Sequence, residues 1–166
     1  MGFLTGKTAI ITGGGRAVLS NGECGSIGYG IATAYAKEGA NLVLTGRNVQ
    51  KLTDAKEELE KKYGIKVLPV QADVSAGADN EAIVQNVVKQ AIDTFGRIDV
   101  LINNAQASAS GVTIADHTTE QFDLAVYSGL YAAFYYMKAC YPYLKETKGC
   151  LLYTSPSHET LANLVC

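Results

Sequence analysis

The sequence predicts a doubly wound α/β fold, in which helices cover both faces of a parallel sheet. Short aliphatic runs alternate with longer amphipathic stretches along the chain, and a glycine-rich segment follows the first run. The runs are continuously apolar, as is typical of strands that are covered on both faces. With 166 residues, 48% of them apolar, the chain is long enough for one domain with a sizeable core.

The aliphatic runs are the predicted strands, and the stretches between them are the predicted helices. The runs are rich in Val, Ile, Leu and Thr, and they comprise residues 8–12, 42–45, 66–70 and 100–102, with a further candidate at 151–154. The stretches between them place apolar residues at three- and four-residue steps, with Lys and Glu on the other side. This spacing predicts helices over residues 29–37, 49–63 and 80–95.

Glycines mark the ends of these helices. Gly39, Gly64 and Gly96 each follow a helical stretch and precede a strand, where a left-handed cap conformation suits glycine. The regular alternation of strand and helix implies right-handed crossovers between parallel strands.

The longest predicted helix covers residues 119–145. The segment Asp116 to Glu120 supplies its start, because Asp and Thr side chains cap free amides and Glu120 suits the positive end of the helix dipole. Aromatic residues recur along this helix, which favours a buried packing face over a ligand platform. They are Tyr127, Tyr131, Phe134, Tyr135 and Tyr141.

Composition excludes several classes of function. The net charge is −2 and no Lys/Arg cluster interleaves with aromatics, so we expect neither a nucleic-acid partner nor an anionic membrane partner. Residues 1–7 resemble neither a signal peptide nor a membrane span, and we therefore expect a cytoplasmic protein. The 4 cysteines lack C-x-x-C spacing and the 2 histidines lack a neighbouring ligand set, so we expect neither disulfides nor a metal site.

The segment TGGGRAVLSNGECGSIGYGIA, residues 12–32, predicts a dinucleotide site. Glycines allow the backbone to turn sharply and approach a pyrophosphate, and the amides of a helix that starts near Ser26 point at the anion. The placement between a strand and a helix makes this a stronger indication than a glycine-rich loop alone, which could simply be flexible. We therefore expect a Rossmann fold, with strand order 3-2-1-4 and room for a fifth strand.

Several of these residues together resemble the fingerprint of the short-chain dehydrogenase/reductase family. They are Thr12-Gly13, Ser26-Ile27-Gly28, Asp73-Val74 and Asn103-Asn104-Ala105, and the resemblance extends over about residues 5–149. Within the family, the motifs NLVLTGRN and GRIDVLINNAQASASG are similar to those of bacterial NADP-dependent 12α-hydroxysteroid dehydrogenases, which act on bile acids. The resemblance implies hydride transfer between nicotinamide and a secondary alcohol or ketone, a small-molecule substrate of the steroid class, and a homo-oligomeric complete protein.

Two other functions stay open on the sequence. One is a ketoacyl or enoyl thioester reductase of the same family, and the other is a non-catalytic nucleotide-binding module. Comparing the turnover of bile acids and of thioesters by the complete protein distinguishes a hydroxysteroid dehydrogenase from the first alternative. Nucleotide binding without turnover supports the second.

The choice of cofactor depends on the end of the second strand, Thr45-Gly46-Arg47-Asn48. NAD-dependent proteins usually place an acidic residue there, whereas Arg47 offers a forked contact to a 2′-phosphate, so we predict NADP. By resemblance, Asp73 and Val74 flank the adenine, and Asn103 and Ala105 line the ribose and nicotinamide side. The predicted cofactor-binding residues are Gly13, Ser26, Ile27, Gly28, Arg47, Asp73, Val74, Asn103 and Ala105.

Four features depart from the family pattern. Ser26 stands where the family has the first glycine of its G-I-G step. Residues 16–25 are inserted before the helix, where they could fold over the phosphates or form a surface insertion. Gln106 stands where the family has glycine. Gly129 stands where the family helix contributes an asparagine to a proton relay.

The resemblance implies a catalytic Ser, Tyr and Lys, with a Tyr-x-x-x-Lys pair after the fifth strand. The pair present, Tyr141 and Lys145, precedes that strand, and about twenty helical residues would carry it roughly 30 Å from the ligand-binding end of the sheet. Ser155 lies near the fifth strand, but the alignment places the family serine at Pro156. We therefore predict no catalytic residue in this chain, and no turnover by the chain alone.

The last residues raise a separate expectation. CLLYTS, residues 150–155, can be read from the end sequence of a transposon adapter used in sequencing libraries. We accordingly expect residues 1–149 to form an incomplete dinucleotide-binding domain and residues 150–166 to be a non-native tail, with a natural ending or a gene fusion as the alternative.

Overall fold

The strands lie side by side in one parallel sheet. The computed structural model describes residues 2–153, and its sheet has the order β3-β2-β1-β4-β5. The predicted order and the candidate fifth strand are thus confirmed. The strands are β1 (Thr8–Thr12), β2 (Asn41–Gly46), β3 (Val67–Gln71), β4 (Val100–Asn103) and β5 (Cys150–Tyr153).

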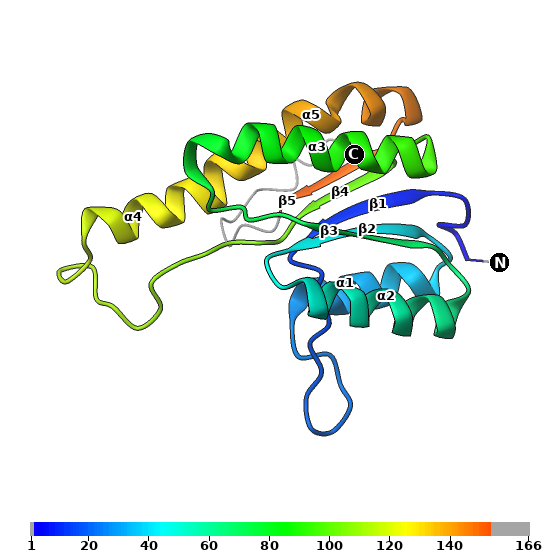
Figure 1. Ribbon diagram of the computed structural model, residues 1–166, viewed down its shortest axis with the longest axis horizontal. Helices are drawn as coiled ribbons and strands as arrows, with labels where there is room; N and C mark the ends of the chain where they lie inside the picture. Colours follow the sequence, from blue (N-terminus) through cyan, green and yellow to red (C-terminus); the bar gives the residue numbers. More distant parts are fainter. Residues whose placement is uncertain (1, 154–166) are drawn as a thin grey trace, which may run out of the picture.

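Helices cover both faces of this sheet (Figure 1). On one face lie α1 (Ile27–Lys37) and α2 (Val49–Tyr63), and on the other lie α3 (Asn80–Phe95) and α5 (Ala132–Thr147). Ile11 of β1 packs in the core on the α1 and α2 face, and the adjacent Ile10 packs in the core on the α3 and α5 face. Because successive side chains of a strand point to opposite faces, the central strands need apolar residues at every position.

The predicted glycine caps are present. Gly39, Gly64 and Gly96 have φ of 85°, 68° and 72°, and the last two are the C-cap residues of α2 and α3. In this left-handed region a side chain would clash with its own backbone, so glycine ends the helix at least cost.

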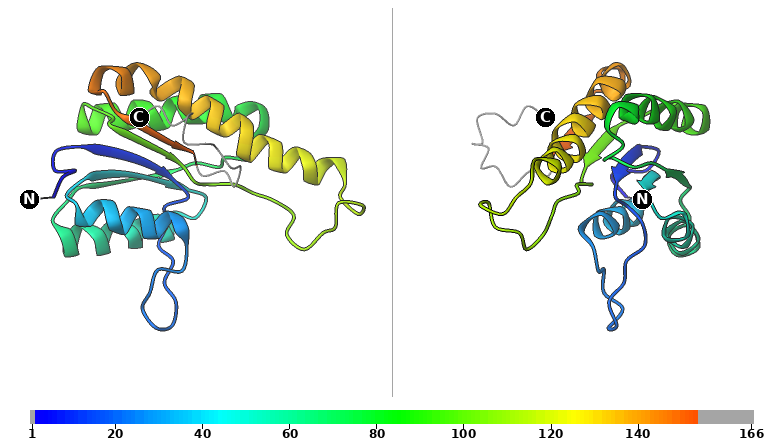
Figure 2. Two further views of the ribbon diagram at one scale, coloured as in Figure 1. Left: turned by 180° about the vertical axis from the view of Figure 1, so that it is seen from behind. Right: turned by 60° about the vertical axis from the view of Figure 1, so that its left-hand side comes forward.

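The long helix is continuous but not uniform. It begins with α4 (Thr119–Ala125), passes through a π-helical stretch, η2 (Val126–Tyr131), and continues as α5. Thr118 is the N-cap residue and forms a capping box with Gln121. The helix thus begins within the predicted segment 116–120. The α4 end extends beyond the sheet, as does the loop that precedes it (Figures 1 and 2).

The aromatic residues of this helix are not the buried face that the sequence predicts. Tyr127, Tyr131 and Phe134 are 40%, 44% and 51% exposed, and Tyr141 is also exposed. The buried side of α5 consists instead of Ala132, Ala133, Tyr136, Ala139 and Cys140. Of the predicted aromatic residues, only Tyr135 packs partly against this core. The prediction fails for the other four because small side chains bring α5 close to β4 and α3.

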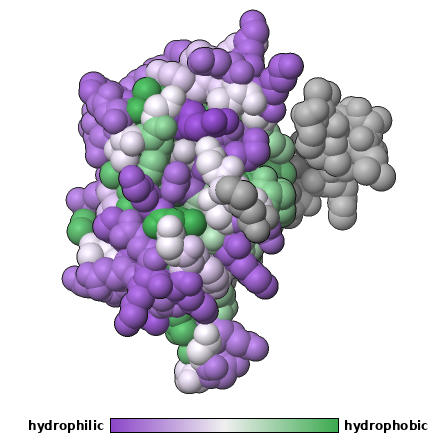
Figure 3. Space-filling model, turned by 90° about the vertical axis from the view of Figure 1, so that its right-hand side faces the viewer, coloured by the Kyte–Doolittle hydropathy of each residue, from purple (hydrophilic) through white to green (hydrophobic). Residues whose placement is uncertain are grey.

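The two ends of the sheet differ in character. At the amino ends of the strands, Asp99 is buried and accepts hydrogen bonds from the Thr8 amide and the Arg97 guanidinium, while Lys7 lies 3.8 Å away. This end of the molecule has a largely hydrophilic surface (Figure 3).

At the edge of the sheet, Pro69 of β3 lies opposite Leu44 of β2 and has no amide hydrogen to offer a further strand.

Within residues 2–153, no helix has both the length and the apolar content that crossing a bilayer requires.

Candidate dinucleotide-binding site

The carboxyl ends of the central strands meet the glycine-rich turn and the start of α1. β1 pairs with β2 on one side and with β4 on the other, so the helical connections leave the sheet in opposite directions at this point. Such a reversal of strand order opens the crevice in which doubly wound folds bind ligands. A pocket with about 690 Å³ of empty space lies here, lined by Gly13, Thr45, Gly46, Arg47, Ala72, Asp73, Val74, Asn104, Ala105, Gln106 and Ala107.

The structure therefore brings together Gly13, Arg47, Asp73, Val74 and Ala105, five of the predicted cofactor-binding residues. Ser26, Ile27 and Gly28 lie at the adjacent amino end of α1. Asn103 lines a smaller neighbouring pocket, described below.

The start of α1 packs against β1 without room for a side chain. A Cβ added to Gly28 would lie 2.2 Å from the Gly13 carbonyl oxygen and 2.6 Å from Nδ2 of Asn104. Ser26 is the N-cap residue, and its Oγ accepts a hydrogen bond from the Tyr29 amide. The close approach therefore brings the first turn of α1 next to Gly13, which lines the crevice. The free amides at the start of a helix favour anions.

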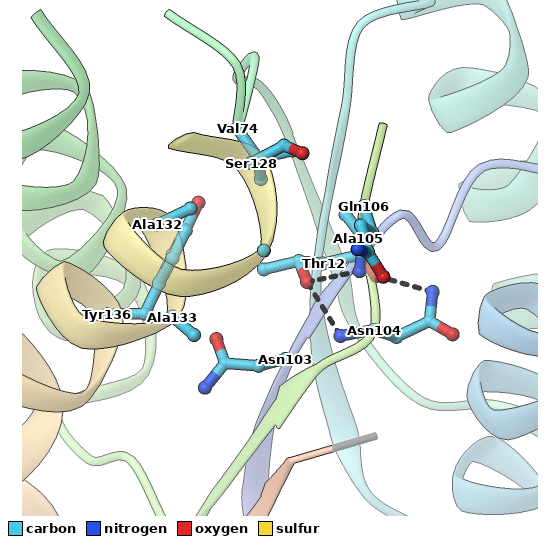
Figure 4. Close-up of a pocket in the computed structure, with 11 residues that line it drawn as sticks. Thr12, Val74, Asn103, Asn104, Ala105, Gln106, Ser128, Ala132, Ala133 and Tyr136 are labelled. Atoms are coloured by element: carbon cyan, nitrogen blue, oxygen red, sulfur yellow. Dashed lines mark hydrogen bonds between the residues drawn. The ribbon is translucent and has the colours of Figure 1, made fainter. Parts of the chain in front are cut away.

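Thr12 joins the ends of β1 and β4. Its Oγ1 accepts hydrogen bonds of 2.9 Å from the amides of Asn104 and Ala105, and Asn104 Nδ2 donates to the Thr12 carbonyl oxygen (Figure 4). These bonds fix the backbone that follows β4. Thr12 and Asn104 belong to the fingerprint, but their roles could not be predicted from the sequence, because each bonds a partner more than ninety residues away.

Arg47 and Asp73 lie at the β2 and β3 side of the pocket. Gln71 Nε2 donates to the Arg47 carbonyl oxygen and holds the turn after β2, while the guanidinium is exposed. Partial burial opposes the charged form of Asp73, but hydrogen bonds from Ser75 and the charge of Arg47 outweigh it and lower the Asp73 pKa. No carboxylate occupies positions 46–48, and the carboxylate in this pocket is that of Asp73.

The smaller pocket lies between β4 and the long helix. Asn103 points from β4 toward Ala133 and Tyr136 (Figure 4). Ser128 in η2 accepts a hydrogen bond from the Ala107 amide and donates to the Leu124 carbonyl oxygen. Burial raises the pKa of Tyr136 to about 12. The sequence reading missed Ser128 and Tyr136, because their roles depend on how the helix crosses β4.

Gly129 also lines this pocket, and it leaves room for a neighbour. A Cβ at Gly129 would lie 3.2 Å from Nε2 of Gln106, so the Gln106 side chain lies against the Gly129 backbone. Gln106 and Gly129, which both depart from the family pattern, are thus in contact.

The inserted segment forms a hairpin away from the pocket. Val18 and Cys24 form an isolated antiparallel bridge, and the tip projects beyond the layer of α1 and α2 (Figures 1 and 2). Arg16 anchors its base through an ion pair of 2.5 Å to Glu58 of α2. Of the two predicted roles, the geometry corresponds to a surface insertion.

Tyr141 and Lys145 lie on the outer part of α5, and neither residue lines either pocket. Ser155 and Pro156 fall outside the described residues, as does most of the predicted tail. Within the part of the chain that the structure describes, no cluster of three His, Cys, Asp or Glu residues could hold a metal ion.

Comparison with known proteins agrees with this geometry. A family model described as enoyl-(acyl carrier protein) reductase matches residues 22–163. A 12alpha-hydroxysteroid dehydrogenase from a Clostridium species is 64% identical over 152 residues, which are 92% of this chain and 56% of that protein. Hydroxysteroid dehydrogenase-like protein 2 of Mus musculus is 35% identical over 93% of this chain and 30% of its own length. The chain thus spans about half, or less, of the curated relatives that it matches.

Solved structures show the same fold. An alcohol dehydrogenase from Thermococcus sibiricus, complexed with 5-hydroxy-NADP, has a TM-score of 0.76 at 29% identity and covers 87% of this chain and 56% of its own. L-sorbose reductase from Gluconobacter frateurii, complexed with NADPH and L-sorbose, has a TM-score of 0.76 at 31% identity over 91% of this chain and 52% of its own. On its fold, its motifs and these matches, the chain belongs to the short-chain dehydrogenase/reductase family of oxidoreductases.

Proposed function

We propose that this chain is the NADP-binding part of an oxidoreductase that transfers a hydride between nicotinamide and a secondary alcohol or ketone. We further propose that the complete protein acts on a hydroxysteroid of the bile-acid class. The 64% identity to a 12alpha-hydroxysteroid dehydrogenase supports the substrate class. Residues 1–149 supply the dinucleotide-binding domain in this proposal, and the cytoplasmic location stays a prediction.

The residues around the crevice fit a dinucleotide. The glycine contact between α1 and β1 leaves a cradle at the helix start, where the amides of Ser26, Ile27 and Gly28 would hold the pyrophosphate. Arg47 would bind a 2′-phosphate, and Asp73 and Val74 would flank the adenine. Asn103 and Ala105 would line the ribose and nicotinamide side. When bound, NADP supplies the hydride acceptor, while the chain orients it and shields it from water.

Arg47 is the observation that carries the choice of NADP. Arg47 lines the pocket at the end of β2, and Asp73, the carboxylate in that pocket, lies beyond β3. A forked, charge-assisted contact to a phosphate contributes about 1.5–3 kcal/mol.

The test compares NADP and NAD binding to the unmodified chain and to Arg47→Ala by titration calorimetry. We expect Arg47→Ala to lose NADP affinity by about tenfold to a hundredfold, with NAD affinity unchanged. Lys145→Ala is the matched control, because this exposed cation lines neither pocket. An unchanged preference in Arg47→Ala would contradict this role of Arg47, and a preference of the unmodified chain for NAD would contradict the assignment of NADP.

We propose that the chain alone turns over no substrate. Tyr141 is 62% exposed and lies outside both pockets, which supports the view that Tyr141 and Lys145 are no catalytic pair. Tyr141→Phe should accordingly leave NADP binding unchanged. Ketone reduction by the purified chain, abolished by Tyr141→Phe, would refute this proposal.

The family model favours a second candidate, because its description names an enoyl thioester reductase. Turnover by the complete protein decides between them. Oxidation of a 12-hydroxy bile acid with NADP supports the first proposal, and reduction of enoyl or ketoacyl thioesters supports the second.

We also propose that the complete protein is a homo-oligomer. Tyr127, Leu130, Tyr131 and Phe134 form an exposed aromatic and aliphatic face on the long helix, which supports an interface there. Sedimentation of the complete protein and its Phe134→Lys variant tests this: a monomer in both would contradict it.

A further inference from the structure

Gln106 lies where the two halves of the crevice meet. It follows the segment Asn103–Ala105, whose backbone Thr12 holds through two hydrogen bonds. It lines both the larger pocket, on the Arg47 side, and the smaller pocket, on the Asn103 side. Because Asn104 and Ala105 are fixed to β1, the position from which the Gln106 side chain extends is fixed as well.

The path of a dinucleotide places its nicotinamide half near this position. Dinucleotides lie across the crevice at the reversal of strand order, here between β2 and β4, with the pyrophosphate at the start of the first helix. With the adenosine half beside Arg47, the other half crosses β1 and reaches the end of β4. That end carries Asn103 and Gln106 (Figure 4).

Gly129 leaves the space beside the long helix in which the Gln106 side chain lies. An added Cβ would meet the Gln106 side chain at 3.2 Å from Nε2, 3.5 Å from Cδ and 3.7 Å from Cγ. A side chain at position 129 would therefore press on the carboxamide, which would have to shift by a few tenths of an ångström. Ser128 next to it ties η2 to Ala107, one residue after Gln106, so both sides of this contact are anchored.

The carboxamide itself is available to a ligand. Among residues 2–153, neither its oxygen nor its nitrogen has a recorded hydrogen bond, and the residue is exposed. By contrast, the neighbouring polar side chains Asn104 and Ser128 are occupied by backbone partners. A carboxamide offers both two donors and an acceptor, which suits ribose hydroxyls and the nicotinamide amide equally.

We propose that Gln106, in the space that Gly129 leaves, is a positioning residue that hydrogen-bonds the nicotinamide half of the bound dinucleotide. This inference rests on the proposed function. In this proposal Gln106 makes the contact to the dinucleotide, and Gly129 provides the space that the Gln106 side chain occupies.

The experiment separates the two halves of the cofactor. NADPH and adenosine 2′,5′-bisphosphate, which lacks the nicotinamide half, are titrated into the chain and into Gln106→Met, which keeps the length of the side chain and removes its hydrogen bonds. We expect Gln106→Met to weaken NADPH binding about three- to tenfold, the effect of one or two neutral hydrogen bonds. The affinity for the bisphosphate and the thermal midpoint should not change. Gln85→Met, an exposed glutamine on α3, is the matched control.

Gly129→Ala tests the contact. Alanine favours the helical backbone, so a loss of NADPH affinity in this variant would not reflect unfolding. We expect Gly129→Ala to lower NADPH affinity when residue 106 is glutamine and to leave it unchanged when residue 106 is methionine. Such non-additive effects are expected of two residues that act through one contact.

Each result decides a different point. If the unmodified chain binds neither probe, the proposed function fails and this inference fails with it. If both probes bind and Gln106→Met leaves NADPH affinity unchanged, or weakens both probes equally, the inference alone is overturned. Equal losses for Gly129→Ala in both backgrounds would overturn the role of Gly129.

Discussion

At the junction of α1 with β1 and β4, single atoms determine whether the site can form. The Gly13 carbonyl oxygen and the Asn104 amide nitrogen occupy the space beside Gly28. Asn104 in turn donates to Thr12, so the glycine contact and the hydrogen bonds between β1 and β4 form one unit. A side chain inserted here would move the helix start and the crevice together.

Gly28→Ala should therefore destabilise the chain, whereas Gly30→Ala should not. The first added Cβ meets backbone at 2.2 Å, and overpacking of this kind costs about 1–3 kcal/mol. The second meets only Cys24 Cβ at 3.8 Å, and alanine gains up to about 1 kcal/mol over glycine inside a helix. Urea unfolding of both variants measures the difference, and equal stabilities would count against the contact.

Sequence reasoning reached some of these residues and not others. The positions of Ser26–Gly28 at the start of α1 and of Arg47 at the end of β2 could be predicted, because each lies in a segment whose local pattern marks the end of a strand or the start of a helix. The contact between Gln106 and Gly129 could not be predicted, since it depends on the angle at which one helix crosses one strand. The sequence marks both positions only as departures.

At the scale of elements, periodicity predicted where helices and strands lie but not which face is covered. The predicted strand 8–12 and helices 49–63 and 80–95 have the observed bounds. The aromatic residues of the long helix have helical spacing, yet the face that packs consists of alanines and Tyr136. Spacing identifies a face of a helix, and only the neighbouring elements determine whether that face is buried.

The hairpin formed by the insertion should be dispensable for binding. Replacing its tip, residues 19–23, by Asn-Gly keeps the bridge between Val18 and Cys24 and the Arg16 ion pair, and Asn-Gly suits a two-residue turn. We expect NADP affinity within roughly twofold and stability within about 0.5 kcal/mol of the unmodified chain. A tenfold loss of NADP affinity would instead indicate that the hairpin reaches the phosphates.

At the scale of the whole molecule, the carboxyl ends of the strands carry the candidate binding site, and the amino ends carry contacts that stabilise the fold. The carboxyl ends of the strands form the crevice. The amino ends of the strands meet at Asp99, whose carboxylate contacts Thr8 and Arg97 and whose carbonyl oxygen accepts from the Cys150 amide. One residue thus contacts three neighbouring strands or the segments that lead into them.

Asp99→Asn should lower stability in a pH-dependent way. Burial alone would raise the pKa of Asp99, but Arg97, the Thr8 amide and Lys7 together lower it below the usual value. A depressed folded-state pKa stabilises the fold above the unfolded pKa of about 3.9, and this contribution disappears as the pH falls through the folded value. We expect Asp99→Asn to lose about 1–3 kcal/mol at pH 7.

Urea unfolding at pH 7 and at successively lower pH measures this difference. The gap between the variant and the unmodified chain should narrow as the pH falls below about 4. Asp93→Asn, which removes an exposed partner of Lys89, should change stability by less than about 1 kcal/mol at any pH. A gap for Asp99→Asn that is independent of pH would rule out the charge as its cause.

The proline in β3 has a consequence for how misfolded copies of this chain could associate. Strand-by-strand growth of a fibril needs an unbroken series of amide donors along the exposed edge, and Pro69 interrupts that series in the middle of a five-residue strand. Templated cross-β growth is therefore disfavoured from this side of the molecule, whichever sequence approaches it.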